Sequence, residues 1–149
     1  MKIVVDTNII FSTLLNSNNT IGDLLFNPDT YFEFYSCDYI RYEIQKHWER
    51  LKMISKFSDE QLEVSYSHIL SKLNFINEEI IPVETWLAAE RITKKIDIDD
   101  IDFVALTKFL KATLWTGDKV LYNGLKQINF KKIINTTELL ALSITKDWK

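Results

Sequence analysis

The sequence predicts an α/β fold in which helices cover both faces of a central, five-stranded parallel sheet. Short apolar segments alternate with longer amphipathic segments along the chain, which is the pattern of strand–helix units in a parallel sheet. The first short segment, KIVV at residues 2–5, has the continuous apolar run of a strand buried on both faces. We therefore expect three layers, α/β/α, with right-handed connections.

Length and composition place the chain in a single domain of ordinary size. Its 149 residues, 46% apolar and 26% charged, are enough for a sizeable core in a soluble globular protein. No apolar run is long enough for a membrane span, and the apolar stretch at the N-terminus is too short for a secretion signal. The single cysteine, Cys37, excludes an internal disulfide and a cysteine-rich zinc site, so we expect a reducing cytoplasm.

The remaining elements follow from apolar spacing, composition and capping residues. Ser58, followed three residues later by Gln61, is a capping box that begins a helix. Pro82 indicates the end or edge of a short strand, and Thr136 is expected to cap the last helix. We predict strands at 31–36, 79–83, 112–116 and 132–135, and helices at 9–15, 20–26, 39–53, 58–73, 85–95, 100–110, 119–127 and 136–144. The two helices between the second and third strands should form an αα-hairpin.

Two acids follow the carboxyl ends of predicted strands. Asp6 comes directly after the first strand, and Asp118 stands just past the fourth, which reads ATLWT. In doubly wound sheets these two strands are commonly neighbours, and ligands bind beyond the carboxyl ends of the strands near the switch point. We therefore expect the two carboxylates to lie close together.

Two further acids are expected at the same rim of the sheet. Asp100 begins the predicted helix IDFVALTKFL, where capping and the helix dipole favour an acid. Glu43 lies one turn into the helix after YFEFYS, between Ile40 and Ile44, on or near the face that packs inward. A carboxylate at that position is costly to bury without a partner.

Converging carboxylates without basic partners raise one another's pKa values unless a cation neutralises them. The simplest cations are Mg²⁺ and Mn²⁺, because both prefer oxygen ligands. Metals held by carboxylates activate water for in-line attack on a phosphodiester and stabilise the leaving oxygen. The acids therefore indicate metal-dependent hydrolysis of a phosphodiester.

Three segments resemble the signature segments of the PIN-domain nucleases. They are VDTNI at 5–9, DDIDFVALT at 99–107 and LWTGDKVL at 114–121, and Glu43 in YIRYEIQKH resembles the second acid of that family. VDTN alone is a weak match, whereas the four elements in this order, over nearly the whole chain, are a specific one. Because the family includes VapC-type toxins and other metal-dependent ribonucleases, the resemblance implies a single PIN-like domain with Mg²⁺- or Mn²⁺-dependent endoribonuclease activity.

The resemblance also implies roles for individual residues. The metal-binding acidic quartet of the family matches Asp6, Glu43, Asp100 and Asp118. Asn8 matches the amide that orients the first acid and the water shell of the metal, and Thr116 matches a hydroxyl that supports the site from the strand end. Thr7 is expected only to shape the turn.

The acid-rich run IDIDDID departs from the family pattern. The third acid of the family stands three residues before the aromatic or aliphatic residue of an FVAL-like run, which selects Asp100 over Asp99. Asp102 stands where a small residue or proline is more usual, and it could ligate metal through water or simply cap the helix. The choice among Asp99, Asp100 and Asp102 therefore stays open.

Simpler roles are also open. Asp6 and Asp118 could be turn or cap residues, and Glu43 could be an exposed residue paired with Arg41 or Lys46. The histidines, His47 and His68, are expected at the surface or the edge of the core, and Cys37 as a small buried hydrophobe. The cations around the acidic segments could form a basic rim that meets phosphates or ordinary solvated faces; they are Arg41, Lys46, Lys108, Lys111 and Lys119.

Other α/β families fit less well. A receiver domain needs an acidic pair after the first strand and an acceptor aspartate after the third, which here ends in Pro82-Val83-Glu84. Phosphatases of the haloacid-dehalogenase type need D-x-D after the first strand, and DTN lacks the second acid. Gly22, Gly117 and Gly124 do not form the glycine-rich turn of a dinucleotide binder. The remaining alternative is a catalytically silent PIN-like module that binds RNA or protein.

The resemblance also indicates partners. VapC-type toxins are usually held by an antitoxin peptide in the site groove and often form homodimers. An RNA substrate is therefore expected, with an antitoxin protein and a second copy of the chain as candidate partners. The net charge of −3 argues against a protein that holds nucleic acid by bulk charge.

Overall fold

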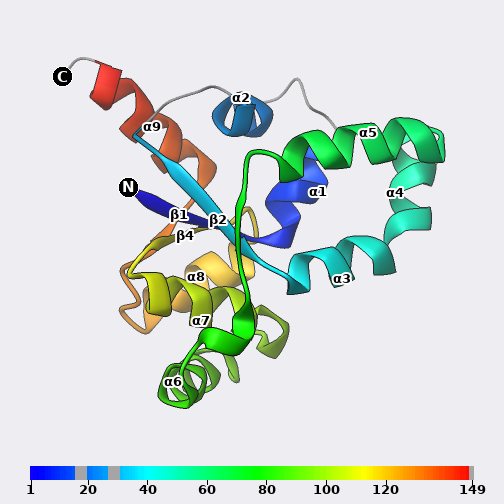
Figure 1. Cartoon of the computed structure of the whole chain (residues 1–149). Helices are drawn as coiled ribbons and strands as arrows, with labels where there is room; N and C mark the ends of the chain where they lie inside the picture. The colour runs from blue at the N-terminus through cyan, green and yellow to red at the C-terminus, as the bar shows by residue number, and fades with distance from the viewer. Residues whose placement is uncertain (16–19, 27–30, 148–149) are drawn as a thin grey trace.

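The computed structural model describes residues 1–15, 20–26 and 31–147, with side chains to residue 144. The strands in these ranges form one five-stranded parallel sheet in the order β3-β2-β1-β4-β5 (Figure 1). They are β1 (Lys2–Val5), β2 (Glu33–Cys37), β3 (Asn74–Ile76), β4 (Thr113–Trp115) and β5 (Ile133–Ile134). The predicted α/β class with a central parallel sheet is confirmed.

The strand order reverses between β1 and β4. The chain adds β2 and β3 on one side of β1, then crosses to add β4 and β5 on the other. Val5 pairs with Trp115 in the register of this central pair, and the Asp6 N–H donates to the Trp115 carbonyl at 3.4 Å. The switch point, where ligands bind in open α/β sheets, therefore lies directly beyond Val5 and Trp115.

Helices cover both faces of the sheet (Figure 1). α7 packs on β1, β2 and β4, with α6 outside it, whereas α1, α2, α5 and α9 lie on the opposite side. The helices are α1 (Thr7–Leu15), α2 (Thr20–Phe26), α3 (Tyr39–Lys46), α4 (Trp48–Ser55), α5 (Asp59–Leu70), α6 (Val83–Thr93), α7 (Ile101–Leu110), α8 (Lys119–Gln127) and α9 (Thr136–Asp147). Two 3₁₀ turns, Glu78–Ile80 and Ile98–Asp100, precede α6 and α7.

The core lies between these layers. Ile3, Val4 and Val5 are fully buried, as expected for a strand covered on both faces, and Phe103 of α7 and Trp115 are among the largest buried side chains. Cys37 is also buried, which confirms the expectation of a small buried hydrophobe. Among the described residues, no helix is both long and apolar enough to cross a membrane.

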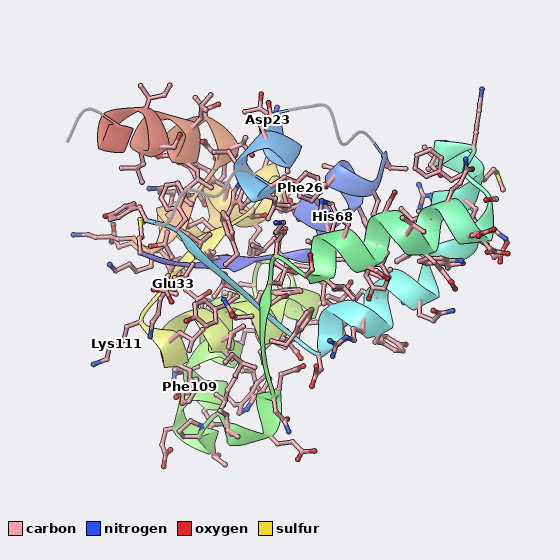
Figure 2. The ribbon with its side chains drawn as sticks, turned by 45° about the horizontal axis from the view of Figure 1, so that its top comes forward. Asp23, Phe26, Glu33, His68, Phe109 and Lys111 are labelled. Atoms are coloured by element: carbon pink, nitrogen blue, oxygen red, sulfur yellow. The ribbon has the colours of Figure 1, made fainter. Side chains whose placement is uncertain are left out.

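α5 begins where its capping residues predict. The Gln61 N–H donates to the Ser58 Oγ at 3.1 Å, and the Ser58 N–H donates to the Gln61 Oε1 at 2.9 Å. This reciprocal pair satisfies two donors at the helix start. Further along α5, the His68 ring stacks on Phe26 of α2 with centroids 4.6 Å apart (Figure 2). The capping box is confirmed, and His68 lies at the junction of two helices.

The third strand differs from its prediction. Residues 79–83 were predicted as a strand, whereas the strand is Asn74–Ile76, which pairs with β2. Glu78–Ile80 form a 3₁₀ turn whose cap, Asn77, accepts from the Glu79 N–H at 2.9 Å. Pro82 precedes the first turn of α6, where its missing N–H costs nothing. A short apolar run such as Ile80-Ile81 is ambiguous by pattern, and Ile80 proves 57% exposed.

The helix predicted over 39–53 and the cap of the last helix also differ from prediction. The single helix predicted over 39–53 is divided at His47, whose N–H donates to the carbonyls of both Glu43 and Ile44. α9 is capped by Asn135 instead of Thr136: the Glu138 N–H donates to the Asn135 Oδ1 at 2.8 Å, and the Asn135 N–H donates to the Glu138 Oε1 at 3.0 Å. Asn135 occupied the predicted last strand, and pairing of that strand ends at Ile134.

Candidate metal centre

Asp6 lies at the carboxyl end of β1, where the strand turns into α1. Its side chain is only 3% exposed, and its Oδ1 accepts a hydrogen bond from the Ile9 N–H at 3.2 Å. Two residues further on, the Asn8 Oδ1 accepts from the Gly117 N–H at 3.0 Å. Asn8 therefore joins the turn after β1 to the turn after β4, across the switch point.

Thr116 and Asp118 lie beyond the carboxyl end of β4. The Thr116 hydroxyl is buried; it hydrogen-bonds the Asp6 carboxylate and accepts from the Asp118 N–H at 3.0 Å. The Asp118 Oδ1 accepts from the N–H groups of Val120 and Leu121 at 2.9 and 3.3 Å. Asp118 thus caps α8 with one oxygen, and its carboxylate faces the acid on β1 closely enough to raise the pKa of Asp6.

Asp100 stands at the start of α7 and lies near Asp118. Oxygen atoms of Asp97, Asp100 and Asp118 lie within 4.8 Å of one another. The Asp100 Oδ2 is buried and has no hydrogen-bond partner. Asp97 is brought to this group by the 3₁₀ turn Ile98–Asp100, which it caps by accepting from the Asp99 N–H at 3.0 Å. We refer to Asp6, Asp97, Asp100 and Asp118 as the acid cluster.

Glu43 approaches the acid cluster from α3. Its Oε1 accepts a hydrogen bond from the Thr7 hydroxyl at 2.6 Å, and its carboxylate is among the charges that raise the pKa of Asp100. Burial raises the pKa of Glu43 above its ordinary value, while the Thr7 hydrogen bond opposes that shift. Glu43 is therefore a half-buried neighbour of the cluster, held at the end of β1 by Thr7.

The acid cluster is electrostatically strained. Burial raises the pKa of Asp6 to about 7, against hydrogen bonds from Thr116 and Ile9 that favour its charged form. Burial also raises the pKa of Asp100 to about 8, and the charges of Asp6, Asp97, Asp118 and Glu43 add to that shift. In the part of the chain that the structure describes, none of these carboxylates forms an ion pair. Such an arrangement is favourable only when protons or a cation neutralise it.

The donor set fits a hard divalent cation. The cluster offers carboxylate oxygens, including the buried and unpaired Asp100 Oδ2, and Mg²⁺ and Mn²⁺ prefer oxygen ligands. Asp97, Asp100 and Asp118 could hold such an ion, with Asp6 and Glu43 beside them. Both histidine rings pack on aromatic side chains: His47 lies edge-on to Phe11 with centroids 5.5 Å apart, near enough to Glu43 for its charge to lower the pKa of that acid, and His68 stacks on Phe26.

Asp102 belongs to a different group. Its carboxyl hydrogen-bonds Glu78 near the Cys37 thiol, and burial together with that hydrogen bond raises the pKa of Asp102 to about 8. The Glu78 Oε1 also accepts from the Tyr39 N–H at 2.7 Å. Glu78 thus ties α7 to the first turn of α3. Of the three acids left open in IDIDDID, Asp100 is the one that joins Asp118.

The expected basic rim is not a single surface. Lys119 follows Asp118 directly, whereas Lys108 and Lys111 lie at the end of α7 and precede β4, at the opposite end of the sheet from the acids. Arg41 forms an ion pair with Asp38 at 2.7 Å, and Lys46 acts on Glu43 only as a neighbouring charge. The sequence grouping of these cations therefore does not correspond to one rim.

A pocket adjoins the acid cluster at Asp118. Its volume is about 250 Å³, and it is lined by Thr116, Gly117, Asp118, Lys119, Tyr122, Asn135, Thr136 and Thr137. The Tyr122 hydroxyl donates to the Glu138 Oε1 at 2.8 Å, and the Trp115 indole donates to the Thr136 hydroxyl at 3.0 Å. Hydrogen bonds thus position Tyr122 and Thr136, two of the residues that line this pocket.

Sequence reasoning missed Asp97 and the link from Thr7 to Glu43. The three-residue spacing of Asp97 and Asp100 could have indicated the first, because residues three apart eclipse one another in a 3₁₀ turn. The Thr7 hydroxyl carried no comparable signal, since its partner is 36 residues away.

Comparisons with known proteins agree with this architecture. A family model of the PIN domain matches residues 4–143. The structure is similar to that of VapBC2 from Rickettsia felis, solved with a DNA fragment from the promoter, with a TM-score of 0.69 and 17% identity over 91% of this chain and 98% of that one. A protein from Pyrobaculum aerophilum gives a TM-score of 0.64 and 13% identity over 95% and 88% of the two chains.

A toxin–antitoxin complex from Klebsiella pneumoniae gives a TM-score of 0.61 and 16% identity over 89% of this chain and 96% of that one. At these identities the solved structures show a shared fold. A search of curated proteins finds no match. The family model, in contrast, spans nearly the whole chain, including all of the acid cluster. The protein belongs to the PIN-domain family.

Proposed function

We propose that the protein is a Mg²⁺- or Mn²⁺-dependent endoribonuclease that hydrolyses RNA phosphodiester bonds at the acid cluster. The observation that carries the proposal is the Asp100 Oδ2, which is buried without a hydrogen-bond partner among three further carboxylates. A site of that kind is stable with a bound cation and unfavourable without one. Membership of the PIN family, together with the fit of the donor set, favours nuclease chemistry over other uses of a metal.

In this proposal Asp97, Asp100 and Asp118 would hold the metal, with Asp6 beside them as a further ligand. The bound metal would neutralise charge on the phosphate and make water more acidic. The water oxygen attacks phosphorus, and the bond to the leaving ribose oxygen breaks. Glu43, whose pKa is raised by burial, suits the role of accepting the proton that the water loses. Solvent supplies a proton to the leaving oxygen.

The remaining predicted residues act through these acids. Thr116 orients the Asp6 carboxylate and supports the Asp118 backbone. Asn8 holds the turns after β1 and β4 together through Gly117. The pocket beside Asp118 is the place that the geometry offers for the nucleotide next to the cleaved bond, since Asp118 belongs both to its lining and to the acid cluster.

The experiment compares Mn²⁺-dependent cleavage of a mixed RNA by the wild type, Asp6→Asn and Asp100→Asn. Asp23→Asn, an exposed acid on α2 (Figure 2), is the matched control. Both cluster variants should lose at least about 100-fold in rate, since even loss of a residue that supports a metal ligand costs about 10–100-fold. The control should cut as the wild type does.

Equal cleavage by the cluster variants, or no cleavage by the wild type in Mn²⁺ or Mg²⁺, contradicts the proposal. Calorimetric titration with Mn²⁺ then tests the alternative, a silent PIN-like binding module. A silent module without a metal site should give no heat of binding that Asp100→Asn abolishes.

We further propose that the ribonuclease acts in the cytoplasm as the toxin of a toxin–antitoxin pair. Two of the similar solved structures are a VapBC protein and a toxin–antitoxin complex. Induced expression should arrest growth of a bacterial host, and Asp100→Asn should not. An adjacent reading frame that encodes a small DNA-binding fold with a tail should relieve the arrest when co-expressed. Arrest by both forms of the protein would contradict a toxic nuclease.

A further inference from the structure

Six cations line two hollows that α6 borders, outside the acid cluster. Arg91, Lys94 and Lys95 line a hollow of about 550 Å³. Lys108, Lys111 and Lys132 line a second hollow of about 540 Å³. Among the residues that line either hollow there is no acid. In a chain with a net charge of −3, this is a local concentration of positive charge.

The two hollows are both bordered by α6. Thr85 lines the second hollow, while Ala88 and Ile92 line the first, and these residues follow one stripe of α6 at spacings of three and four. Ile128 also lines the first hollow, and Phe130, two residues further along the chain, lines the second. The stripe runs about 10 Å from Thr85 to Ile92. We call the combined feature the α6 groove.

The cations of the α6 groove are available to a ligand. All six side chains belong to exposed residues, and within the described ranges none of them forms an ion pair. Lys111 points away from the ribbon into solvent in Figure 2. Arg91 and Lys108 stand in the last turns of α6 and α7, where cations favour the helix dipole. That local role does not explain Lys132, which precedes β5, or the absence of acids from both linings.

The groove leads to the acid cluster. Ile96 lines its first hollow, and the next residue, Asp97, belongs to the cluster. Adjacent Cα atoms are about 3.8 Å apart. The backbone that lines the first hollow therefore continues directly into the acid cluster.

We propose that the α6 groove binds the backbone of single-stranded RNA and directs it to the acid cluster. The inference rests on the proposed function, because the RNA is bound in order to be cut at the acid cluster. The binding itself is argued from the residues that line the groove. Cationic edges match phosphates, and a floor that includes Ile92, Ile96, Ile128 and Phe130 matches the unstacked bases of a single strand. A duplex keeps its bases inside and would leave that floor unused.

The test measures binding of a fluorescent 20-nucleotide RNA by anisotropy in EDTA, where cleavage does not interfere. The near variant is Arg91→Gln/Lys94→Gln/Lys95→Gln, and the far variant is Lys108→Gln/Lys132→Gln. Lys111 is left unchanged because its φ of 54° makes substitution a backbone perturbation. The matched control, Lys2→Gln/Arg50→Gln/Lys72→Gln, removes the same charge as the near variant from exposed positions outside both linings.

The near variant should bind RNA about tenfold more weakly than the control. Its slope of log K against log salt should be smaller by about 2, because each phosphate contact on a single strand contributes about 0.7. The far variant should also bind the 20-mer more weakly than the control does. Thermal unfolding checks that each variant is folded. If the near variant does not fold, the RNA affinity of the far variant tests the groove by itself.

Three outcomes overturn the groove. The first is an equal loss of RNA affinity in the near variant and the control, and the second is no loss of RNA affinity in either groove variant. The third is that a 20-base-pair DNA duplex binds as tightly as the RNA and loses the same affinity in the groove variants. The nuclease proposal fails separately. If wild type binds RNA through the groove but does not cut it in Mn²⁺, the groove stands and the nuclease does not. If the wild type cuts RNA but the groove variants bind RNA as tightly as the wild type, the nuclease proposal stands and the groove proposal fails.

Discussion

The Thr7 hydroxyl donates a hydrogen bond of 2.6 Å to the Glu43 Oε1, which joins the end of β1 to α3. Thr7 is only 6% exposed, so the contact lies at the inner side of the site. The sequence suggested that this threonine merely shapes the turn. In the structure it is the side chain that holds the proposed proton acceptor beside the acid cluster.

Replacing Thr7 with Val keeps the shape of the side chain and removes the hydroxyl. We expect cleavage to fall by about 10–100-fold, the usual cost of losing a supporting contact at a metal site. Because the hydrogen bond from Thr7 lowers the pKa of Glu43, the acidic limb of the pH–rate profile should also move to higher pH. Thr7→Ser should restore both rate and profile. A Thr7→Val enzyme with the wild-type profile would show that the contact is only structural.

Asn8 should stabilise the junction between β1 and β4 through its 3.0 Å hydrogen bond with the Gly117 N–H. Asn8→Ala should lower the free energy of unfolding by about 1 kcal/mol, with or without Mg²⁺. Asn8→Asp keeps an acceptor but adds a negative charge, so it should destabilise the protein in EDTA and much less in Mg²⁺. Urea unfolding in both buffers measures the difference. Equal effects of the two substitutions in EDTA would contradict this role.

The metal-free protein should lose stability as pH rises from about 4 to 8. The folded-state pKa values of Asp6 and Asp100 are raised from 3.8 to about 7 and about 8, so the folded state holds protons that the unfolded state has released. Asp100→Asn should therefore increase the free energy of unfolding in EDTA. Discounted for the partial exposure of Asp100, the gain should be about 1–2 kcal/mol at pH 8 and smaller at pH 5.

Thermal unfolding between pH 5 and 8.5 provides the measurement, with Asp23→Asn as the control that should not change the slope. Mn²⁺ should raise the melting temperature of the wild type more at pH 8 than at pH 5, and should not stabilise Asp100→Asn to the same extent. A melting temperature in EDTA that does not change with pH would show that the pKa values of Asp6 and Asp100 are not raised in the folded state.

Gly124 should be a packing requirement of α8 against the segment that carries Asp97. A Cβ at Gly124 would lie 2.9 Å from the Ile96 Cγ2 and 3.0 Å from its Cδ1. Gly124→Ala should destabilise the wild type by about 1 kcal/mol, because overpacking outweighs the roughly 1 kcal/mol gained in helix propensity. In an Ile96→Ala background the same substitution should stabilise by about 1 kcal/mol. A double-mutant cycle in urea checks this reversal of sign.

Much of the fold could be predicted from the sequence. KIVV, the Ser58–Gln61 capping box and the helix Lys119–Gln127 are local signals, since burial on both faces, reciprocal capping and apolar spacing leave direct marks in a few adjacent residues. The third strand was misplaced because Asn74–Ile76 is only three residues long, too short for a recognisable pattern. What makes it a strand is its pairing with β2, through which Asn74 also reaches the Phe34 carbonyl at 3.0 Å.

The positions of Asp6, Asp100 and Asp118 could likewise be predicted, because strand ends and helix starts in a parallel sheet meet at one rim. Contacts between residues distant in the sequence decide which acids gather at that rim. Asp97 joins the cluster through a 3₁₀ turn, and Asp102 is drawn to Glu78 instead. Local pattern sets which face of an element a side chain occupies, whereas distances of a few ångströms, and with them charge repulsion and cation binding, depend on how separate elements pack.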